Sequence, residues 1–516
     1  MMLKLFIRKD VRQLIEDAAD PTRSEGGHRF KRTLGAFNLI MLGIGGIIGA
    51  GVFSLTGTAA AYYAGPGIVF SFMIGGVLCA FAGLCYAEMA AMVPVSGSAY
   101  AYSYATMGEF VAWIIGWDLI LEYAFGAVTV CASWSGYLFS LVVKTLGVKL
   151  SDRMILFSKG PWELVTLNDG SQTFGYWNAP ASMIAIVLAG ILYRGMAESS
   201  WFNNFIVFLK ITIVLLFIGL GWAVVDSHLW VGDSSVSGLA SFVPPQAILM
   251  RNGKQFMSFG WPGVLTGAGV VFFSYVGFDA ISTTAQECKN PKRDLPIGII
   301  TSLLVCTLLY VFVALVITGV VPYQQLGVAD PVAVGVDHIV ALRGWKPLAQ
   351  KVFTFFMKFG ALAGLTSVIL VLMMAQTRIF YSMAKDGLLP WFGLMHKKYS
   401  TPHVATIFAG MMVGICSGFI PMSLVGELVS IGTLLAFVLV CAGIPILRIK
   451  FPDVPRPFKT PLYFLVAPMG VVSCLWVMSG LPLDTWMRLL IWLLVGLIIY
   501  FGYGIKKSKL RSSLKD

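Results

Sequence analysis

Residues 43–57 read G-I-G-G-I-I-G-A-G-V-F-S-L-T-G and lie inside the first long apolar segment of the chain. Five glycines fall within nine positions of this stretch, and each costs an α-helix about 1 kcal/mol relative to alanine. Within a membrane, an interrupted helix is tolerated only where the freed backbone groups are buried in protein or line a watery cavity. We therefore predict an interrupted helix whose bare N–H groups hold a ligand. Close helix–helix packing through small residues is the alternative explanation.

The composition indicates a protein with many membrane spans. Of 516 residues, 57% are hydrophobic and 12% are charged, whereas a soluble globular protein carries about 25% charged residues. This difference excludes an assembly of two or three soluble domains. The net charge of +12 comes mainly from Lys and Arg in the tails and in the gaps between apolar runs. That distribution is typical of membrane orientation and not of a nucleic-acid-binding face.

The sequence gives no support for a metal centre, an enzyme or a nucleotide-driven pump. Nearly all of the eight cysteines lie within apolar runs and show no C-x-x-C spacing, so we interpret them as small buried hydrophobic side chains. The five histidines form no H-x-x-x-H or H-E-x-x-H motif, and no G-x-x-x-x-G-K-S/T loop occurs. We expect no metal, no cofactor and no nucleic-acid partner.

Twelve apolar runs are long enough to cross a bilayer, which requires about 20 residues per helix. The sequence predicts spans at 36–60, 67–93, 109–142, 178–194, 203–226, 262–283, 295–321, 352–381, 403–420, 424–448, 462–481 and 486–505. Basic residues gather in the gaps and tails that would place both termini in the cytoplasm, so we expect a multi-pass protein of the plasma membrane. Residues 1–33 are polar and basic, and predict either a short amphipathic helix on the inner leaflet or a partly disordered tail.

A second interruption is predicted in the sixth span, where residues 267–279 read G-A-G-V-V-F-F-S-Y-V-G-F-D. The first and sixth spans would each open a block of five, and a pair of glycine-interrupted segments in corresponding positions is typical of a transporter site. We therefore predict an all-α membrane protein with twelve transmembrane helices in three parts. The parts are a first repeat at 34–226, an inverted second repeat at 227–450, and two further helices with a cytoplasmic tail at 451–516.

Two facing interruptions would suit the zwitterion of an α-amino acid. The N-terminal end of a half-helix presents free N–H groups to a carboxylate, and we assign Ala50 and Gly51 to this role. Unwound carbonyls and a helix C-terminal end suit an ammonium group, and we assign the carbonyls of Phe273, Ser274 and Val276 to it. A sugar or a simple ion would not use both kinds of site at once.

Six motifs between residues 46 and 390 carry a family resemblance. They read G-I-I-G-A-G-V-F-S-L-T-G, G-S-A-Y-A-Y-S-Y, G-W-D-L-I-L-E-Y, F-F-S-Y-V-G-F-D-A, N-P-K-R-D-L-P-I-G-I and Q-T-R-I-F-Y-S-M-A-K-D-G-L-L-P. In this order they resemble the cationic amino acid transporter family, part of the amino acid–polyamine–organocation superfamily. The resemblance implies a leucine-transporter-type fold, transport by alternating access, and Phe278 as an aromatic lid. The candidate substrate site then comprises Ile47, Ala50, Gly51, Phe273, Ser274, Val276, Phe278 and Leu372.

Lys210 lies inside the predicted fifth span, where an ionised side chain costs on the order of 3 kcal/mol. One interpretation is a side chain that snorkels to the cytoplasmic interface about 10 Å away. The other is a desolvated lysine that releases its proton during transport, and whose ammonium group takes the place of a sodium ion between the first and eighth spans. The family resemblance implies the second, with Thr366 or Ser367 as the hydroxyl partner. We therefore predict proton coupling, with sodium coupling as the alternative.

Five carboxylates complete the set of candidate residues. Asp118 and Glu122 are four residues apart and share one helix face, where they would either relay protons or hold a neighbouring helix. Glu88, together with Glu287 and Asp294 beside two basic loop residues, predicts a cytoplasmic gate network. Charges that are simply solvated are the alternative for this second group.

The sequence thus predicts a secondary active amino acid transporter. A gated channel or an amino acid sensor with a transporter-like body is the alternative, although a channel needs a continuous polar lining and the polar positions here are islands in apolar spans. Residues 369–374 of the eighth span are all apolar, which favours small neutral amino acids, with cationic amino acids as the alternative. Partners are then the amino acid substrate and the lipid bilayer, and an accessory subunit is left open.

Overall fold

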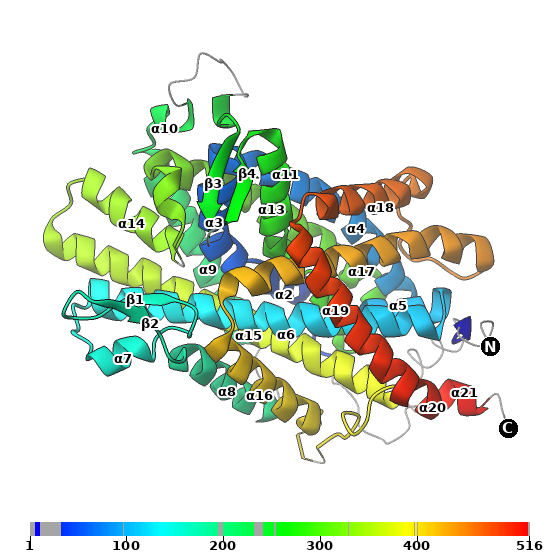
Figure 1. The fold of residues 1–516 in the computed structure, drawn as a ribbon. Helices are drawn as coiled ribbons and strands as arrows, with labels where there is room; N and C mark the ends of the chain where they lie inside the picture. The colour runs from blue at the N-terminus through cyan, green and yellow to red at the C-terminus, as the bar shows by residue number, and fades with distance from the viewer. Residues whose placement is uncertain are drawn as a thin grey trace.

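We describe the protein from a computed structural model. The structure describes residues 6–10, 32–95, 97–194, 200–231, 241–251, 254–328, 330–396, 398–399 and 401–513. Of the helix or tail predicted within residues 1–33, only residues 6–10 and 32–33 are described, and the rest lies outside these ranges. The described residues are mainly helical (Figure 1).

The helices up to residue 231 agree with the predicted first five spans within a few residues. They are α2 (Ala36–Ile47), η2 (Gly51–Leu55), α3 (Thr56–Ala59), η3 (Ala60–Ala64), η4 (Gly65–Gly67), α4 (Ile68–Met92), α5 (Ser98–Thr106), α6 (Glu109–Phe139), η5 (Ser140–Thr145), α7 (Asp152–Leu156), α8 (Ala179–Arg194), α9 (Ser200–Trp222) and α10 (His228–Val231). The predicted first span is divided among α2, η2, α3 and the start of η3. The predicted third span continues from α6 into η5.

The helices after residue 258 include the predicted spans six to twelve. They are α11 (Gly260–Val271), η7 (Phe272–Tyr275), α12 (Ala280–Thr283), η8 (Ala285–Glu287), α13 (Pro291–Val320), η9 (Tyr323–Leu326), α14 (Pro331–Leu342), α15 (Pro347–Lys385), α16 (His403–Phe419), α17 (Met422–Lys450), α18 (Tyr463–Ser479), α19 (Leu483–Ile499), η10 (Tyr500–Gly504), α20 (Ile505–Lys507) and α21 (Lys509–Ser513). The predicted sixth span is divided among α11, η7 and α12. The short helix α14 was not predicted.

Eight described segments are long and apolar enough to cross a membrane. The first of them, Ala36–Met92, contains two predicted spans, and the shorter apolar helices α8, α16 and α18 coincide with three others. The predicted helical segments are therefore present. Twelve crossings, the inverted repeat and the division into parts stay predictions.

Two β-hairpins depart from the all-α prediction. β1 (Leu164–Thr166) pairs with β2 (Gln172–Phe174), and β3 (Ala247–Arg251) pairs with β4 (Lys254–Ser258), both antiparallel. Both hairpins lie in connections between apolar helices. Strands of five residues or fewer give too little alternation to be recognised in a sequence dominated by long apolar runs.

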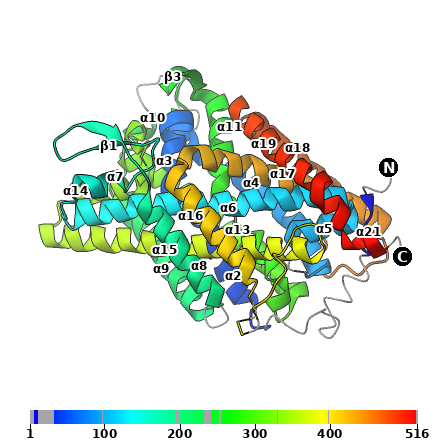
Figure 2. The ribbon, with the colours of Figure 1, turned by 60° about the horizontal axis from the view of Figure 1, so that its bottom comes forward.

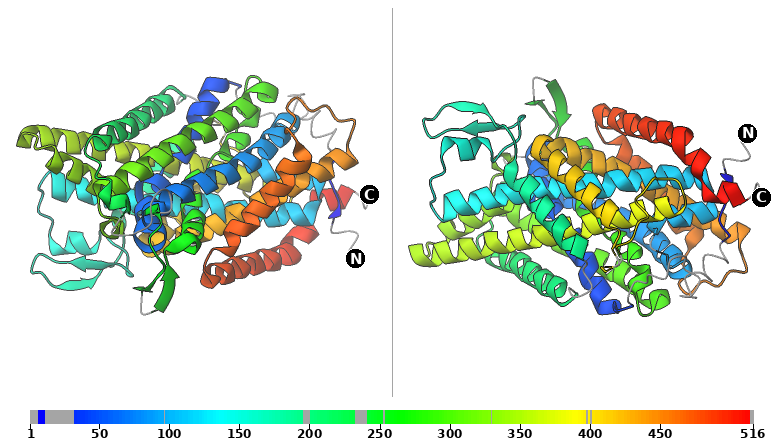
Figure 3. Two further views of the ribbon diagram at one scale, coloured as in Figure 1. Left: turned by 90° about the horizontal axis from the view of Figure 1, so that it is seen from above. Right: turned by 90° about the horizontal axis from the view of Figure 1, so that it is seen from below.

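Two long helices, α6 and α15, lie side by side along the molecule (Figure 2). The β1–β2 hairpin lies at one end of the molecule and α21 at the other, as both views of Figure 3 show. Around this pair, α13 packs on α2 and α4, α8 packs on α16, and α17 packs on α6 and α18. The 39 residues of α15 extend about 58 Å, which exceeds the hydrocarbon thickness of about 30 Å, so this helix is tilted or projects from the bilayer.

Both ends of the described chain meet at the start of α6. The buried carboxylate of Glu109 accepts hydrogen bonds from Tyr500 Oη (2.9 Å) and from Arg511 Nε (2.6 Å) near the C-terminal end. From the N-terminal end, Lys9 Nζ lies 2.5 Å from Asp386 Oδ1, just beyond α15. Residues 6–10 and α21 therefore lie at the same end of the molecule (Figure 1).

Candidate functional site between two interrupted helices

The first predicted span is interrupted, as its glycines indicated. α2 ends at Ile47, Ile48 adopts an extended conformation (φ −71°, ψ 98°), and the chain resumes as the π-helical turn η2. The first N–H groups of a resumed helix have no intrahelical acceptor. Ala50 and Gly51 therefore place backbone donors at the start of η2, where the sequence predicted a carboxylate site.

The sixth predicted span is interrupted as well. After η7, Val276 leaves the helical conformation (φ −58°, ψ 133°) and Gly277 has φ +114°, which favours glycine over any residue with a side chain. The N–H of Val276 donates to the carbonyl of Phe273 at 3.2 Å. One of the carbonyls assigned to the substrate amine thus already accepts one hydrogen bond, and its second lone pair is available to a ligand.

The two interruptions contact each other through backbone atoms. A Cβ atom at Gly277 would lie 2.9 Å from the carbonyl oxygen of Gly46, and one at Gly51 would lie 2.3 Å from Ser274 Cα. No side chain fits at either contact. The glycines therefore permit both the interruption and the close packing, and a ligand-binding role of the freed N–H groups stays a prediction.

All the residues predicted to contact substrate are buried. They are Ile47, Ala50, Gly51, Phe273, Ser274, Val276, Phe278 and Leu372. Seven of them lie in or beside the two interruptions. Leu372 lies on α15 against α6, where a Cβ atom at Gly126 would be 3.3 Å from its Cδ1. The site is therefore closed to solvent in this conformation.

The predicted lid residue, Phe278, belongs to a buried aromatic cluster. Its ring centroid lies 5.5 Å from that of Tyr86 on α4 and 5.0 Å from that of Phe437 on α17. Phe272 lies 5.6 Å from Phe437 and extends the cluster. Sequence reasoning missed Phe437 because no motif connects the tenth predicted span with the sixth. The cluster gives this side of the interruption an apolar wall.

Lys210 points at the first interruption from α9. Its Nζ donates to the carbonyl oxygens of Gly45 (2.9 Å) and Ile48 (2.7 Å) and to Ser367 Oγ (3.0 Å). An ammonium group has three donors, and each has an acceptor here. A Cβ atom at Gly364 would lie 3.0 Å from Lys210 Cε, so this glycine leaves room for the buried side chain. The side chain therefore does not snorkel to an interface.

Of the two hydroxyls predicted as partners of Lys210, the structure brings Ser367 to it and not Thr366. Thr366 Oγ1 accepts a hydrogen bond from Trp134 Nε1 (3.0 Å) and donates to the carbonyl of Leu362 (2.8 Å). Consecutive residues of an α-helix point in directions about 100° apart, so the two hydroxyls face different neighbours. Thr366 joins α15 to α6 instead.

Two carboxylates of α6 are buried without a hydrogen-bond partner among the described residues. They belong to Asp118 and Glu122. A Cβ atom at Gly432 would lie 2.9 Å from Asp118 Oδ1, so α17 covers this carboxylate without bonding to it. Nearby in the sequence, Tyr123 donates to the carboxylate of Asp279 in the second interruption. Both proposed roles of Asp118 and Glu122 stay predictions.

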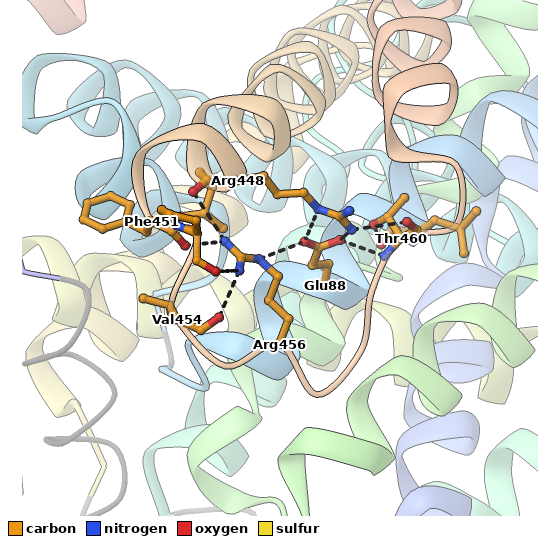
Figure 4. A network of polar contacts seen from close by, with 9 residues as sticks. Glu88, Arg448, Phe451, Val454, Arg456 and Thr460 are labelled. Carbon is orange, nitrogen blue, oxygen red and sulfur yellow. Dashed lines mark hydrogen bonds and ion pairs between the residues drawn. The ribbon is translucent and has the colours of Figure 1, made fainter.

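Glu88 forms a buried ion-pair group with the end of α17 and the segment after it (Figure 4). Arg448 Nε lies 2.9 Å from Oε1 and Arg448 Nη2 lies 2.6 Å from Oε2. The N–H of Thr460 donates to Oε2 at 2.7 Å, and Arg456 Nε lies 3.7 Å from Oε1. The group therefore fastens α4 to the connection between α17 and α18.

The predicted gate network is not joined in the described part of the chain, because Glu287 and Glu88 share no partner there, and the role of either as a gate stays a prediction. Glu287 forms an ion pair with Arg378 of α15. The neighbouring Lys292 and Arg293 are exposed, and no ion pair joins them to Glu287 in the described part of the chain. Arg378 was missed as a partner although it lies within a quoted motif, because nothing in the sequence pairs residues 91 positions apart.

Most of the chain is similar to known transport proteins. Residues 34–501 match the family model described as amino acid permease. The chain is 41% identical over 507 residues to the branched-chain amino acid permease BcaP of Bacillus subtilis (strain 168), covering 98% of this chain and 99% of that protein. It is 39% identical to the methylthioribose transporter of the same organism, covering 93% and 95% of the two chains. It is 32% identical to the vacuolar cationic amino acid transporter 4 of Arabidopsis thaliana, covering 86% and 68%.

The backbone contact between the interruptions can be tested with two alanine variants. We expect Gly51→Ala to lower the apparent Tm of the detergent-purified protein by several degrees, because overpacking costs about 1–3 kcal/mol. The control is Gly219→Ala in α9, where an added Cβ atom meets nothing within 4 Å. Alanine favours helix, so this variant should match or exceed the wild-type Tm. Equal Tm values for the two variants would contradict the contact.

The buried ion-pair group of Glu88 predicts a strong dependence of stability on its charge. Glu88→Gln leaves two arginines without their carboxylate, and we expect a loss of about 3–5 kcal/mol, seen as a large fall in Tm. Glu163→Gln is the matched control, because Glu163 is partly exposed and lies 3.8 Å from Lys159, a type of pair that contributes about 0–1 kcal/mol. Similar Tm changes in both variants would refute a structural role for the buried group.

Proposed function

This chain belongs to the amino acid permease family, as its motifs indicated, and from that premise we propose a secondary active transporter that carries an amino acid by alternating access. The chain is an integral membrane protein and not an enzyme. The observation that supports the proposal most strongly is the pair of interrupted helices, which meet backbone to backbone in a buried site. A helix start with free N–H groups and helix ends with free carbonyls suit the carboxylate and the ammonium of a zwitterion.

Alternating access requires that each side of the site can close. At the end of the molecule where the β1–β2 hairpin lies, Tyr137 Oη of α6 donates to the carbonyl of Phe53 at 2.7 Å. This bond holds the part of the first interrupted helix that follows the interruption. Toward the end where the termini lie, the Glu287–Arg378 ion pair holds the end of the sixth span against α15. In our proposal the described conformation is occluded, and each half-cycle breaks one of these closures. A gated channel has no corresponding need for two closures.

We propose that a proton drives transport through Lys210. Its ammonium group uses the carbonyls of Gly45 and Ile48 and the hydroxyl of Ser367, an arrangement of oxygen atoms that would otherwise suit a small cation. Loss of the proton would remove the positive charge that joins α9, the first interruption and α15. Transport would then need no other cofactor than the proton.

For the substrate we propose a neutral amino acid with a small or branched apolar side chain. The aromatic cluster around Phe278 and the apolar Leu372 support this choice, as does the relative named a branched-chain amino acid permease. A cationic amino acid is the second candidate, because Asp118 and Glu122 are buried carboxylates without described partners. A relative named a cationic amino acid transporter is consistent with it.

We also propose that both termini face the cytoplasm and that the protein resides in the plasma membrane. The basic tails and the common position of residues 6–10 and α21 support this orientation. The repeats would span 34–226 and 227–450, and residues 451–516 would lie outside them.

Proton coupling can be measured in sodium-free proteoliposomes. We expect the wild type to accumulate substrate when an inward proton gradient is imposed. Lys210→Met should lose this accumulation and keep counterflow exchange without a gradient, because the variant lacks the titrating amine. Lys358→Met is the matched control, since Lys358 is also a buried lysine but pairs with the half-exposed Asp337 at 3.2 Å; it should keep the response. A wild-type requirement for sodium, or a Lys210→Met variant that still follows the gradient, would overturn this mechanism.

Substrate class can be decided by competition in the same assay. We expect excess alanine, valine or leucine to inhibit uptake at concentrations at least about tenfold lower than lysine or arginine, a difference of about 1.4 kcal/mol. Inhibition in the reverse order would favour the cationic candidate. In that case Glu122→Gln should weaken lysine binding and leave alanine binding unchanged.

A further inference from the structure

The β1–β2 hairpin turns an apolar face away from the rest of the protein. Leu164 of β1 pairs with Phe174 of β2, and a backbone hydrogen bond of 3.0 Å from the N–H of Gly175 continues this register past the strand ends. Side chains two residues apart on a strand share a face, so Trp162 and Tyr176 lie on the same face as the Leu164–Phe174 pair. More than half of each of these four side chains is exposed.

The opposite face of the hairpin packs on the protein. Val165 on this face is buried, and a Cβ atom at Gly175 would lie 2.4 Å from the carbonyl oxygen of Lys159. In an antiparallel hairpin that faces water on one side, the solvated face is ordinarily polar. The outward face here carries three aromatic rings and a leucine instead. Contiguous exposed apolar side chains of this kind mark a surface that contacts a partner or a membrane.

The charges of this connection do not favour an oppositely charged partner. Residues 144–178 contain four basic and three acidic residues. The polar groups of the turn bond within the connection, since Asn168 Nδ2 donates to Asp152 Oδ1 at 2.8 Å and Ser171 Oγ donates to Asp169 Oδ1 at 2.7 Å. The outward face therefore offers apolar and aromatic area with little net charge. Trp and Tyr rings, which are apolar with one polar edge, are enriched where a membrane meets water.

The outward face adjoins helices that expose apolar side chains. Trp177 stacks on Phe419 at the end of α16 with ring centroids 5.6 Å apart, and its Nε1 donates to Ser182 Oγ of α8 at 2.7 Å. Both helices carry apolar side chains that are more than half exposed, which are Met183, Ile186, Val187, Met411 and Ile415. The hairpin stands to one side of the helices at this end of the molecule (Figure 3). In a membrane protein, these positions place it where lipid-facing helices end.

We propose that the outward face of the β1–β2 hairpin binds the lipid surface as an interfacial anchor. Its side chains lie at the boundary between headgroups and acyl chains, and they are Trp162, Leu164, Phe174 and Tyr176. Through Trp177, the anchor holds the adjoining ends of α8 and α16 at a set depth in the bilayer. The inference requires only that the chain is a membrane protein, so it is independent of the substrate and of the coupling ion.

The depth of the hairpin can be measured with nitroxide labels on the full-length chain in lipid nanodiscs that hold one chain each. The background is Cys416→Ser, because Cys416 is partly exposed and the other seven cysteines are buried. We expect labels at Leu164→Cys and Phe174→Cys to collide more with oxygen than with a water-soluble nickel chelate. Both labels should lie about 5–10 Å below the lipid phosphates, at equal depth because the two residues are paired.

Lys149→Cys is the matched control, because Lys149 is exposed in the same connection but lies outside the hairpin. Its label should collide freely with the nickel chelate. Labels at Leu164 and Phe174 that are as accessible to nickel as this control would overturn the inference, since the face would then lie in water. Labels shielded from both oxygen and nickel would also overturn it, because protein and not lipid would cover the face.

Discussion

The structure depends on one constraint, which is that backbone N–H and C=O groups cannot remain unbonded inside a membrane. Two helices are interrupted within the apolar interior, so their freed carbonyls need donors from elsewhere in the protein. Lys210 supplies them to Gly45 and Ile48, and Tyr310 supplies one to Ile47 or Ser274. The donors left at the start of η2 and the lone pairs left on these carbonyls are what a zwitterion can complete. In our proposal, the substrate supplies the hydrogen bonds that the fold leaves unmade at the two interruptions.

Much of this arrangement could be predicted from local sequence. The glycines at 43–51 and 267–277 indicated the interruptions, and the apolar runs gave the helices within a few residues. Both signals act over short distances in the chain, since a helix is broken or continued by the residues it contains. For Lys210 the local sequence left two positions open, snorkelling to an interface or burial, and the structure shows the buried one.

The rest could not be predicted because it depends on which helices become neighbours. Nothing local distinguishes Thr366 from Ser367, and their roles are separated by whether α6 or α9 lies on the corresponding face of α15. The bridge made by Tyr310 and the partner of Glu287 are pairings of the same kind. The two hairpins were missed for a different reason, since strands this short have no periodicity that long apolar helices do not obscure.

The polar contacts between helices are of two kinds, a buried group around Glu88 that holds two segments together and two smaller contacts that we propose to break during transport. Glu88 is bonded by two arginines and a backbone N–H, and such a group is costly to open, so α4 and the segment after α17 should move together. The closures at Tyr137 and Glu287 have fewer charged partners, since one is a single hydrogen bond to a backbone carbonyl and the other is the ion pair of Glu287 with Arg378. In our proposal each half-cycle breaks one of these closures, and a substrate that binds one conformation more tightly would shift the population toward it.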